Sequence, residues 1–205
     1  MLRCLDLCAG FGGFSQAFVD HPHWEVMRID NNPLLAEVEH MEIIDIFEFR
    51  DTLANMLARG YHPQKPDLIV ASPPCTAFSL GYYSPRSQYS REGRLEEYDP
   101  DMSILNCVLD IVEMLQPRYY IIENVRGAIR YFEPILGKPR QSIKSWYFWG
   151  NYPTIVADID KLPLKKDLDK RHSPLRANYR GVVPYEISTK LLQAIENQTL
   201  LTYWS

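Results

Sequence analysis

Short apolar runs that end in turn residues recur along this chain, and such runs are typical of buried strands. Helical patterns separate them, so strand and helix alternate from the start. The predicted strands are Leu2–Leu7, 24–29, 43–46, Leu68–Ala71, 119–122 and 146–149. The predicted helices are 14–19, a stretch through Leu57 that stops at Gly60, 101–115, and one that begins near Pro184.

This alternation implies right-handed β-α-β units and a doubly wound, mostly parallel sheet of the α/β class. Helix 101–115 carries the clearest pattern, because Asp101 can cap it and apolar side chains follow on one face. Neither an internal repeat nor a low-complexity linker divides the sequence. We therefore expect one domain over residues 1–205.

Residues 80–100 do not fit the pattern, because they show no helical or strand periodicity. The segment carries four tyrosines interleaved with three arginines, namely Tyr82, Tyr83, Tyr89, Tyr98, Arg86, Arg91 and Arg94. Long loops without structure in compact domains are often functional. Two interpretations stay open: a surface that stacks on bases and pairs with phosphates, or a mobile surface loop.

The composition is that of an ordinary globular protein, with 46% hydrophobic and 23% charged residues among 205. No apolar run approaches the roughly 20 residues that cross a bilayer, and Arg3 and Asp6 are not typical of a signal peptide. The four cysteines are too scattered for a disulfide scaffold, and no Cys-x-x-Cys pair suggests a metal site. We expect an intracellular, cytoplasmic protein without a membrane partner.

The charge is unevenly distributed, although the net value is −4. Residues 138–180 hold ten Lys and Arg against four acidic residues, whereas residues 1–100 hold eight against fifteen. The basic segment is either a solvated charged face or a contact for a polyanion. Composition leaves that choice open.

A glycine-rich turn follows the first predicted strand directly and opens a helix. It comprises Cys8, Ala9, Gly10, Phe11, Gly12 and Gly13. Glycines there let the backbone approach a ligand at the carboxyl edge of a sheet. Asp30 ends the second strand and can bind ribose hydroxyls, and Asp45 follows Ile43 and Ile44, where it could meet an adenine. Each feature alone could be a turn or a helix cap. Together they favour a nucleoside cofactor.

The fourth predicted strand ends in Ser72-Pro73-Pro74-Cys75. Two prolines fix the backbone and present Cys75 at the edge of the sheet. A buried structural thiol is the common fate of a lone cysteine, but this position suits a nucleophile. We expect Cys4 and Cys107 to be structural, since they fall in a predicted strand and a predicted helix.

Glu123 follows the apolar end of the fifth predicted strand. Partial burial there would favour its protonated form. A protonated carboxyl that faces Cys75 across adjacent strand ends makes an acid and nucleophile pair, whereas an ordinary cap of the next turn is the plainer alternative.

In their order and spacing, the segment 6–13, the segment 72–79 and Glu123-Asn124-Val125 resemble the cytosine-5 DNA methyltransferases. The resemblance covers residues 1–150 well and the remainder loosely. It implies the Rossmann-like methyltransferase fold, S-adenosylmethionine as cofactor, and double-stranded DNA with a flipped cytosine as substrate. Amino-nitrogen methyltransferases usually have an aromatic residue at the position of Cys75, which argues against that chemistry.

Carried over to this chain, the resemblance makes Cys75 the nucleophile and places Glu123 at the ring nitrogen beside the amino group. The residues that it implies for the cofactor are Cys8, Ala9, Gly10, Phe11, Gly12, Gly13, Asp30, Asn31, Asp45, Ile46, Pro74 and Val183.

The chain departs from the family in three places. Residues 141–145 lack the two arginines of the usual Gln-x-Arg-x-Arg, which Lys144 could replace only in part. Gly181 stands where the final motif has Asn. Residues 151–179 form a short basic insert where relatives carry a recognition domain, so specificity is short or a second chain supplies it. Small members of this shape resemble phage-type enzymes, whose location would be the host cell.

Three functions therefore remain. The first is methylation of carbon 5 of cytosine in DNA. The second is the same chemistry on RNA, because the thiol and the acid do not discriminate the sugar. The third is a cofactor-binding subunit that needs a partner for activity.

Overall fold

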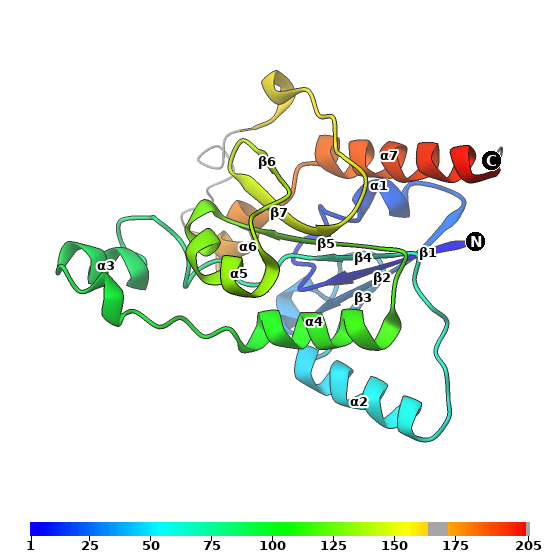
Figure 1. Ribbon diagram of the computed structural model, residues 1–205, viewed down its shortest axis with the longest axis horizontal. Helices are drawn as coiled ribbons and strands as arrows, with labels where there is room; N and C mark the ends of the chain where they lie inside the picture. Colours follow the sequence, from blue (N-terminus) through cyan, green and yellow to red (C-terminus); the bar gives the residue numbers. More distant parts are fainter. Residues whose placement is uncertain (164–171, 204–205) are drawn as a thin grey trace.

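The computed structural model describes residues 1–163 and 172–203, the last five of these by their backbone alone. The strands in this part of the chain are β1 (Leu2–Leu7), β2 (Trp24–Asp30), β3 (Met41–Ile43), β4 (Leu68–Ala71), β5 (Tyr119–Asn124), β6 (Gln141–Ile143) and β7 (Trp146–Asn151). They form one sheet in the order β3-β2-β1-β4-β5-β7-β6 (Figure 1).

Strands β1 to β5 pair in parallel, and only β7 and β6 are antiparallel to their neighbours. The predicted doubly wound, mostly parallel sheet is therefore confirmed. The strand order reverses between β1 and β4, and open α/β sheets bind ligands at the carboxyl ends of strands at such a point.

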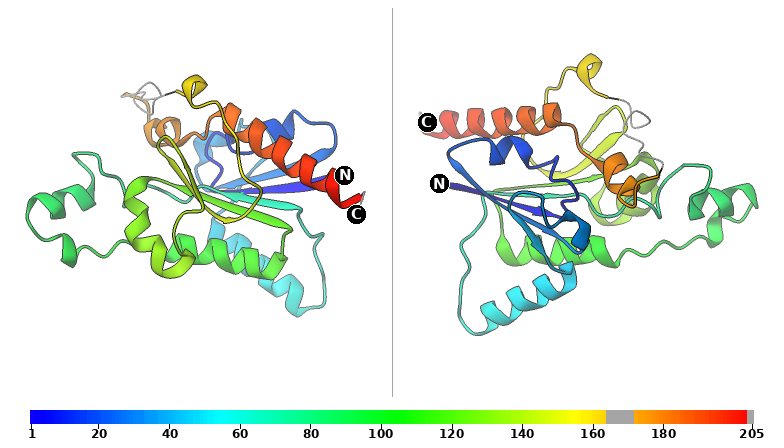
Figure 2. Two further views of the ribbon diagram at one scale, coloured as in Figure 1. Left: turned by 45° about the horizontal axis from the view of Figure 1, so that its top comes forward. Right: turned by 180° about the vertical axis from the view of Figure 1, so that it is seen from behind.

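Helices cover both faces of the sheet. They are α1 (Gln16–Val19), α2 (Ile46–Ala58), α3 (Pro85–Arg91), α4 (Ser103–Leu115), α5 (Ile129–Leu136), α6 (Arg176–Gly181) and α7 (Tyr185–Tyr203). Helices α1 and α7 lie on one face and α2, α4 and α5 on the other (Figures 1 and 2). Among the helices of the described residues, none combines the length and apolarity that a membrane crossing requires.

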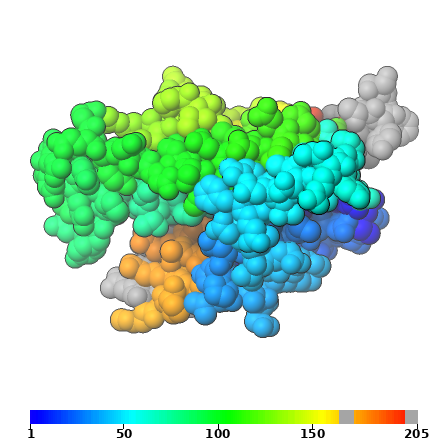
Figure 3. Space-filling view, turned by 90° about the horizontal axis from the view of Figure 1, so that it is seen from below, coloured from blue at the N-terminus to red at the C-terminus, as the bar shows by residue number. Residues whose placement is uncertain are grey.

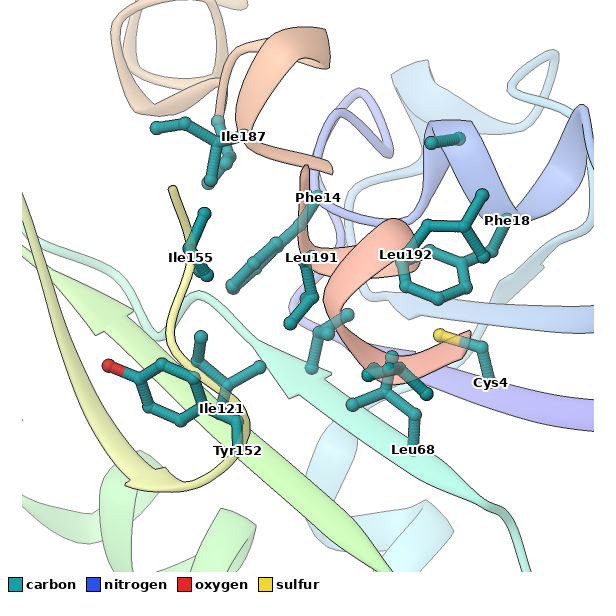
Figure 4. Packing of buried hydrophobic residues seen from close by; sticks show 14 of the residues in the cluster. Cys4, Phe14, Phe18, Leu68, Ile121, Tyr152, Ile155, Ile187, Leu191 and Leu192 are labelled. Atoms are coloured by element: carbon teal, nitrogen blue, oxygen red, sulfur yellow. The ribbon is translucent and has the colours of Figure 1, made fainter. Parts of the chain in front are cut away.

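The buried residues of β4 show why the central strands are continuously apolar. Leu68 and Val70 pack in the cluster beneath α1 and α7, whereas Ile69 and Ala71 pack in the cluster of α2, α4 and α5. Figure 4 shows the first cluster, where Leu191 and Phe18 lie near Leu68. A strand that is buried on both sides has no polar face, so its sequence does not alternate.

Two predicted elements were wrong. The third strand was expected at 43–46, but β3 is Met41–Ile43, and Asp45 instead caps α2 by accepting a hydrogen bond from the Phe47 amide at 2.9 Å. Residues 80–100 are not a structureless loop, because they contain α3 and the short 3₁₀ turn Leu95–Glu97. Neither element buries an apolar side chain completely, so no apolar period revealed them.

Other elements differ from the predictions in their bounds. The helix expected at 14–19 begins at Gln16, and that expected at 101–115 begins at Ser103, whose amide donates to Asp101 at 2.8 Å. Strand β5 extends to Asn124 and so includes Glu123. The expectation that Cys4 and Cys107 are structural is confirmed, since both are buried within β1 and α4.

Candidate functional site

A cavity of about 290 Å³ lies at the carboxyl ends of β1, β2, β4 and β5. This volume is near the lower end of the roughly 300–1,000 Å³ typical of small-molecule sites. The cavity brings together every sequence-predicted site residue except Gly12. Those that line it are Cys8, Ala9, Gly10, Phe11, Gly13, Asp30, Asn31, Asp45, Ile46, Pro74, Cys75, Glu123 and Val183.

The turn after β1 is held against the end of β2. Gly10 has φ +55°, a left-handed conformation that favours glycine, and its amide donates to Asp30 Oδ2 at 2.9 Å. The Asn32 amide donates to the other Asp30 oxygen at 3.0 Å. One carboxylate thus fixes two loops, and the remaining lone pairs of its oxygens stay available at the cavity edge.

Asp45 caps a helix and also lines the cavity. One of its oxygens caps α2, and the other accepts a hydrogen bond from Asn31 Nδ2 at 3.2 Å. The two residues therefore support each other at the edge where the sequence placed the base of a nucleoside. The cap is confirmed, whereas the ligand contact stays a prediction.

Gly12 does not line the cavity because it packs against a buried arginine. A Cβ at Gly12 would lie 2.3 Å from the guanidinium carbon of Arg28. That guanidinium donates to the Gly12 carbonyl at 2.9 Å and to Ser15 Oγ at 2.9 Å. Further bonds run to Gln16 Oε1 and to the Glu39 carbonyl, each at 2.8 Å. Arg28 is thus a buried clamp beneath the glycine-rich turn.

Asp6 completes this buried network. Ser15 Oγ donates to Asp6 Oδ2 at 2.6 Å, so the serine hydroxyl connects the carboxyl to the Arg28 guanidinium. Burial raises the pKa of Asp6 to about 7, and the hydrogen bond from Ser15 and the charge of Arg28 oppose that shift. Burial also lowers the pKa of Arg28. Sequence reasoning missed this network, because an arginine in a strand is indistinguishable from one on a solvated face.

The turn that carries Cys75 is fixed from two sides. The Ser72 amide donates to the Leu7 carbonyl at 3.1 Å, and the Phe78 amide donates to the Cys75 carbonyl at 3.1 Å. Asn124 Nδ2 donates to the Pro73 carbonyl at 3.0 Å across the two strand ends. Asn124 is therefore a positioning residue for the Cys75 turn, and its place beside Glu123 in the motif was the only sequence signal for it.

Glu123 reaches the cavity from the strand next to β4. Ala71 and Ile122 are partners in the parallel register. Ser72 and Glu123, the residues that follow them, therefore lie side by side at the carboxyl ends of adjacent strands. The Glu123 side chain is 4% exposed, and Cys75 is partly buried. The nucleophile and acid candidates thus line one cavity from neighbouring strands.

Helix α6 supplies cavity residues that sequence reasoning missed. Ala177 and Asn178 line the cavity beside Val183, and so does Gly181, which the sequence places in the final motif. A Cβ at Gly10 would lie 3.4 Å from Asn178 Nδ2, and the Phe11 and Tyr179 rings have centroids 4.5 Å apart. Asn178 lies one helical turn before Gly181, so an amide is present near the position where the family motif has Asn.

The hairpin of β6 and β7 does not reach the cavity. Lys144 Nζ donates to the Leu162 carbonyl at 2.6 Å, and Gln141 exchanges two hydrogen bonds with the Ile155 backbone. Both residues therefore hold the segment after β7. Four basic residues of the segment 138–180, for which a polyanion contact is one of the two interpretations, lie outside the described residues: Lys165, Lys166, Lys170 and Arg171.

Several known methyltransferases are similar to this chain in sequence. Type II methyltransferase M1.HphI of Haemophilus parahaemolyticus is 25% identical over 146 residues, which cover 69% of this chain and 36% of that protein. Type II methyltransferase M.AplI of Arthrospira platensis is 27% identical over 171 residues, covering 82% and 39%. The human tRNA (cytosine(38)-C(5))-methyltransferase is 29% identical over 130 residues, covering 62% and 31%.

This chain spans well under half the length of each of these three relatives. The family described as C-5 cytosine-specific DNA methylase matches residues 2–133, which is more than half of the chain. That segment contains the glycine-rich turn, the Cys75 turn and the end of β5. The chain therefore belongs to the C-5 cytosine-specific DNA methylase family.

Proposed function

We propose that this protein transfers a methyl group from S-adenosylmethionine to carbon 5 of cytosine in DNA. The observation that carries the proposal is the convergence of Cys75 and Glu123 on one cavity, from the ends of adjacent strands. Membership in the C-5 cytosine-specific DNA methylase family supports the same reaction.

The cavity fits the cofactor by the chemistry of its lining. Asp30 offers carboxylate lone pairs for ribose hydroxyls, and Asp45 with Ile46 offers a polar and an apolar contact for adenine. Phe11 and Pro74 add apolar surface to the cavity. The negative charges of Asp30 and Asp45 favour the positively charged sulfonium of the cofactor. When bound, S-adenosylmethionine supplies an electrophilic methyl group.

Cys75 and Glu123 would make the cytosine ring reactive. Carbon 5 of cytosine is a poor nucleophile, so Cys75 Sγ adds to carbon 6 and the displaced electron pair develops at carbon 5. Glu123 donates a proton or hydrogen bond to ring nitrogen 3, where it stabilises the charge that the addition creates. Once carbon 5 is methylated, loss of its proton and of the carbon–sulfur bond restores the ring.

A trapping experiment tests the covalent step. In 5-fluorocytosine a fluorine replaces the hydrogen at carbon 5, and the elimination that releases the enzyme cannot remove it. Wild-type protein with cofactor and such a DNA duplex should therefore give an adduct that survives a denaturing gel. Cys75→Ser should give none, whereas Cys107→Ser should trap as wild type does, because Cys107 lies in α4 away from the cavity lining. A Cys75→Ser variant that methylates at the normal rate would remove Cys75 from the mechanism.

A binding experiment tests the cofactor site independently. Asp30→Ala should weaken S-adenosylmethionine binding at least tenfold, which is about 1.4 kcal/mol, because it removes a charge-assisted acceptor. Calorimetry measures the affinity without any nucleic acid. Unchanged affinity in this variant would contradict the assignment of Asp30 to the ribose.

The same chemistry on RNA is a second candidate, which the human tRNA methyltransferase relative favours. The trapping assay with 5-fluorocytosine in matched DNA and RNA duplexes distinguishes the two substrates. Bisulfite mapping of methylated DNA then reports the recognition site. A strict, long site produced by this chain alone would contradict our proposal that recognition is short or comes from a second chain.

A further inference from the structure

A second concave region lies outside the cavity, between α3 and the segment that follows β5. Three of the seven described residues that line it are arginines. The lining residues include Leu80, Arg86, Arg126, Gly127, Arg130 and Glu133. We call this region the arginine cleft, and neither the fold nor the proposed methyl transfer accounts for it.

Two of its arginines have no carboxylate partner within the described part of the chain. The Nε atom of Arg86 is buried and makes no hydrogen bond there, and Arg126 is exposed. A buried N–H group without a hydrogen-bond partner is costly, so an acceptor that reaches Arg86 Nε would be stabilised. Arg130 differs, because its guanidinium pairs with Glu96.

The carboxylates near the cleft do not cancel its charge. Glu133 lines the cleft and Glu96 holds Arg130, which leaves three guanidinium groups against two carboxylates. This cationic surplus stands on a chain whose net charge is −4. Because the rest of the chain carries net negative charge, an anion is attracted to the cleft itself and not to the surface as a whole.

The cleft adjoins the catalytic pair through both loops that carry it. A Cβ on Gly127 would lie 1.9 Å from the Phe78 carbonyl, so the loop after Glu123 touches the loop after Cys75 here. The Phe78 amide in turn donates to the Cys75 carbonyl at 3.1 Å. Arg126 follows Glu123 by three residues, which spans about 10 Å at most. Figure 3 shows α3, in teal to green, projecting from the body of the molecule at this end.

We propose that the arginine cleft binds a backbone phosphate of the nucleic acid next to the target cytosine. The planar guanidinium groups of Arg86 and Arg126 match the oxygens of a phosphodiester, which has the acceptors and the charge that the cleft lacks. This inference rests on the proposed function for the identity of the ligand. The contact positions the strand and carries no base specificity.

Salt titration of binding tests the proposal without any methyl transfer. Arg86→Gln/Arg126→Gln should weaken binding of a 16-base-pair duplex for every sequence tried. The slope of log affinity against log salt should fall by about 0.9, the value for one neutralised phosphate. The matched control is Arg59→Gln, which removes an exposed arginine at the far end of α2 and should leave the slope unchanged.

A second arm locates the phosphate. Single uncharged methylphosphonate linkages are introduced at each position around the cytosine in separate duplexes. At one flanking position, the uncharged linkage should weaken binding by wild type and leave the affinity of the double variant unchanged.

The proposal is overturned if the two proteins share one salt slope, if no linkage distinguishes them, or if wild type binds no duplex. Competition by inorganic phosphate at constant ionic strength as strong as that by duplex would also overturn it, because it would indicate a free-anion site. Since neither arm needs Cys75, failure of the adduct experiment and failure of the cleft are separate results.

Discussion

Two regions next to the cavity, which we call its two walls, are held by different kinds of contact: the network beneath the glycine-rich turn, and the segment 76–102, of which Thr76 lines the cavity. Beneath the glycine-rich turn, the Arg28 guanidinium makes four hydrogen bonds and is fully buried. The segment 76–102 instead contains ion pairs such as that of Arg94 with Glu97, whose side chains are 49% and 59% exposed. The Arg28 side chain is enclosed by protein, whereas the Arg94 side chain is about half exposed to solvent.

The difference separates rigidity from adaptability. Buried polar networks act as a unit and fix their surroundings, because each partner left unsatisfied costs free energy. Exposed ion pairs contribute little and are screened by salt, so a segment held by them rearranges at small cost. The turn that would hold a cofactor is therefore prearranged, and the segment that would meet a nucleic acid is held at its ends, by Phe78 packed on Phe132 and by the Tyr98 hydroxyl on the Ala77 carbonyl.

Replacing one arginine from each wall gives the largest expected contrast. Arg28→Met should lower the free energy of unfolding by roughly 3–5 kcal/mol, because it leaves buried acceptors and Asp6 without their cation. Arg94→Met should leave the melting temperature unchanged, since its pairs are exposed. Denaturant unfolding measures both variants. Equal stability of the two would contradict the distinction between the walls.

The pH dependence of stability sharpens the same contrast, because Asp6 titrates in the buried wall. Its pKa of about 7 in the folded protein exceeds the ordinary value, so the folded state binds more protons than the unfolded state between about pH 4 and pH 7. Stability should therefore fall as pH rises through this window, by up to about 1.4 kcal/mol per pH unit.

Asp6→Asn should remove this contribution, so its unfolding free energy should vary less between pH 4 and pH 7 than that of wild type. Asp101→Asn is the control, because an exposed neighbour amide, that of Ser103, lowers the pKa of Asp101 and places its titration below the window. Parallel pH profiles for wild type and Asp6→Asn would show that Asp6 does not titrate where its burial implies.

The fold and parts of the candidate site could be predicted from the sequence, whereas the buried network of the turn wall could not. The parallel strands were predictable because burial on both faces demands uninterrupted apolar runs such as Leu68–Ala71. The glycine-rich turn and Cys75 were predictable because short-range backbone requirements place them. Arg28 was not, since its burial depends on Ser15, Gln16 and Glu39 brought together by the fold.

The missed elements lacked the signals on which sequence reasoning relied. Helix α3 buries no residue, and β6 has three residues, so neither shows a period. Asn178 went unnoticed because the motif was compared at the position of Gly181, one helical turn later. Local patterns report burial and turns well, and they report contacts between distant segments poorly.

Alanine substitutions at two glycines with nearly the same φ distinguish the cost of a steric clash from the cost of backbone strain. Gly12 has φ +70° and Gly93 has φ +69°, so an alanine at either position carries the left-handed cost of roughly 1–2 kcal/mol. Only at Gly12 would the Cβ also meet Arg28, at 2.3 Å, whereas nothing lies within 4 Å at Gly93. Gly12→Ala should therefore lose about 1–3 kcal/mol more unfolding free energy than Gly93→Ala. Equal losses in denaturant unfolding would show that the guanidinium moves aside freely.

The smallest expected effect concerns the amide that α6 adds to the turn wall. Asn178 lines the cavity opposite Gly10, where its side chain can bond to a ligand that the protein backbone leaves room for. One hydrogen bond contributes about 0.5–1.5 kcal/mol, so Asn178→Ala should weaken S-adenosylmethionine binding by roughly two- to tenfold. Arg180→Ala is the control, because Arg180 is an exposed residue of the same helix and does not line the cavity. Calorimetry of both variants measures the difference, and thermal unfolding checks that α6 is intact. If Asn178→Ala binds as tightly as Arg180→Ala, the family's missing Asn has no replacement in this chain, and the turn wall holds the cofactor by Asp30 and the backbone alone.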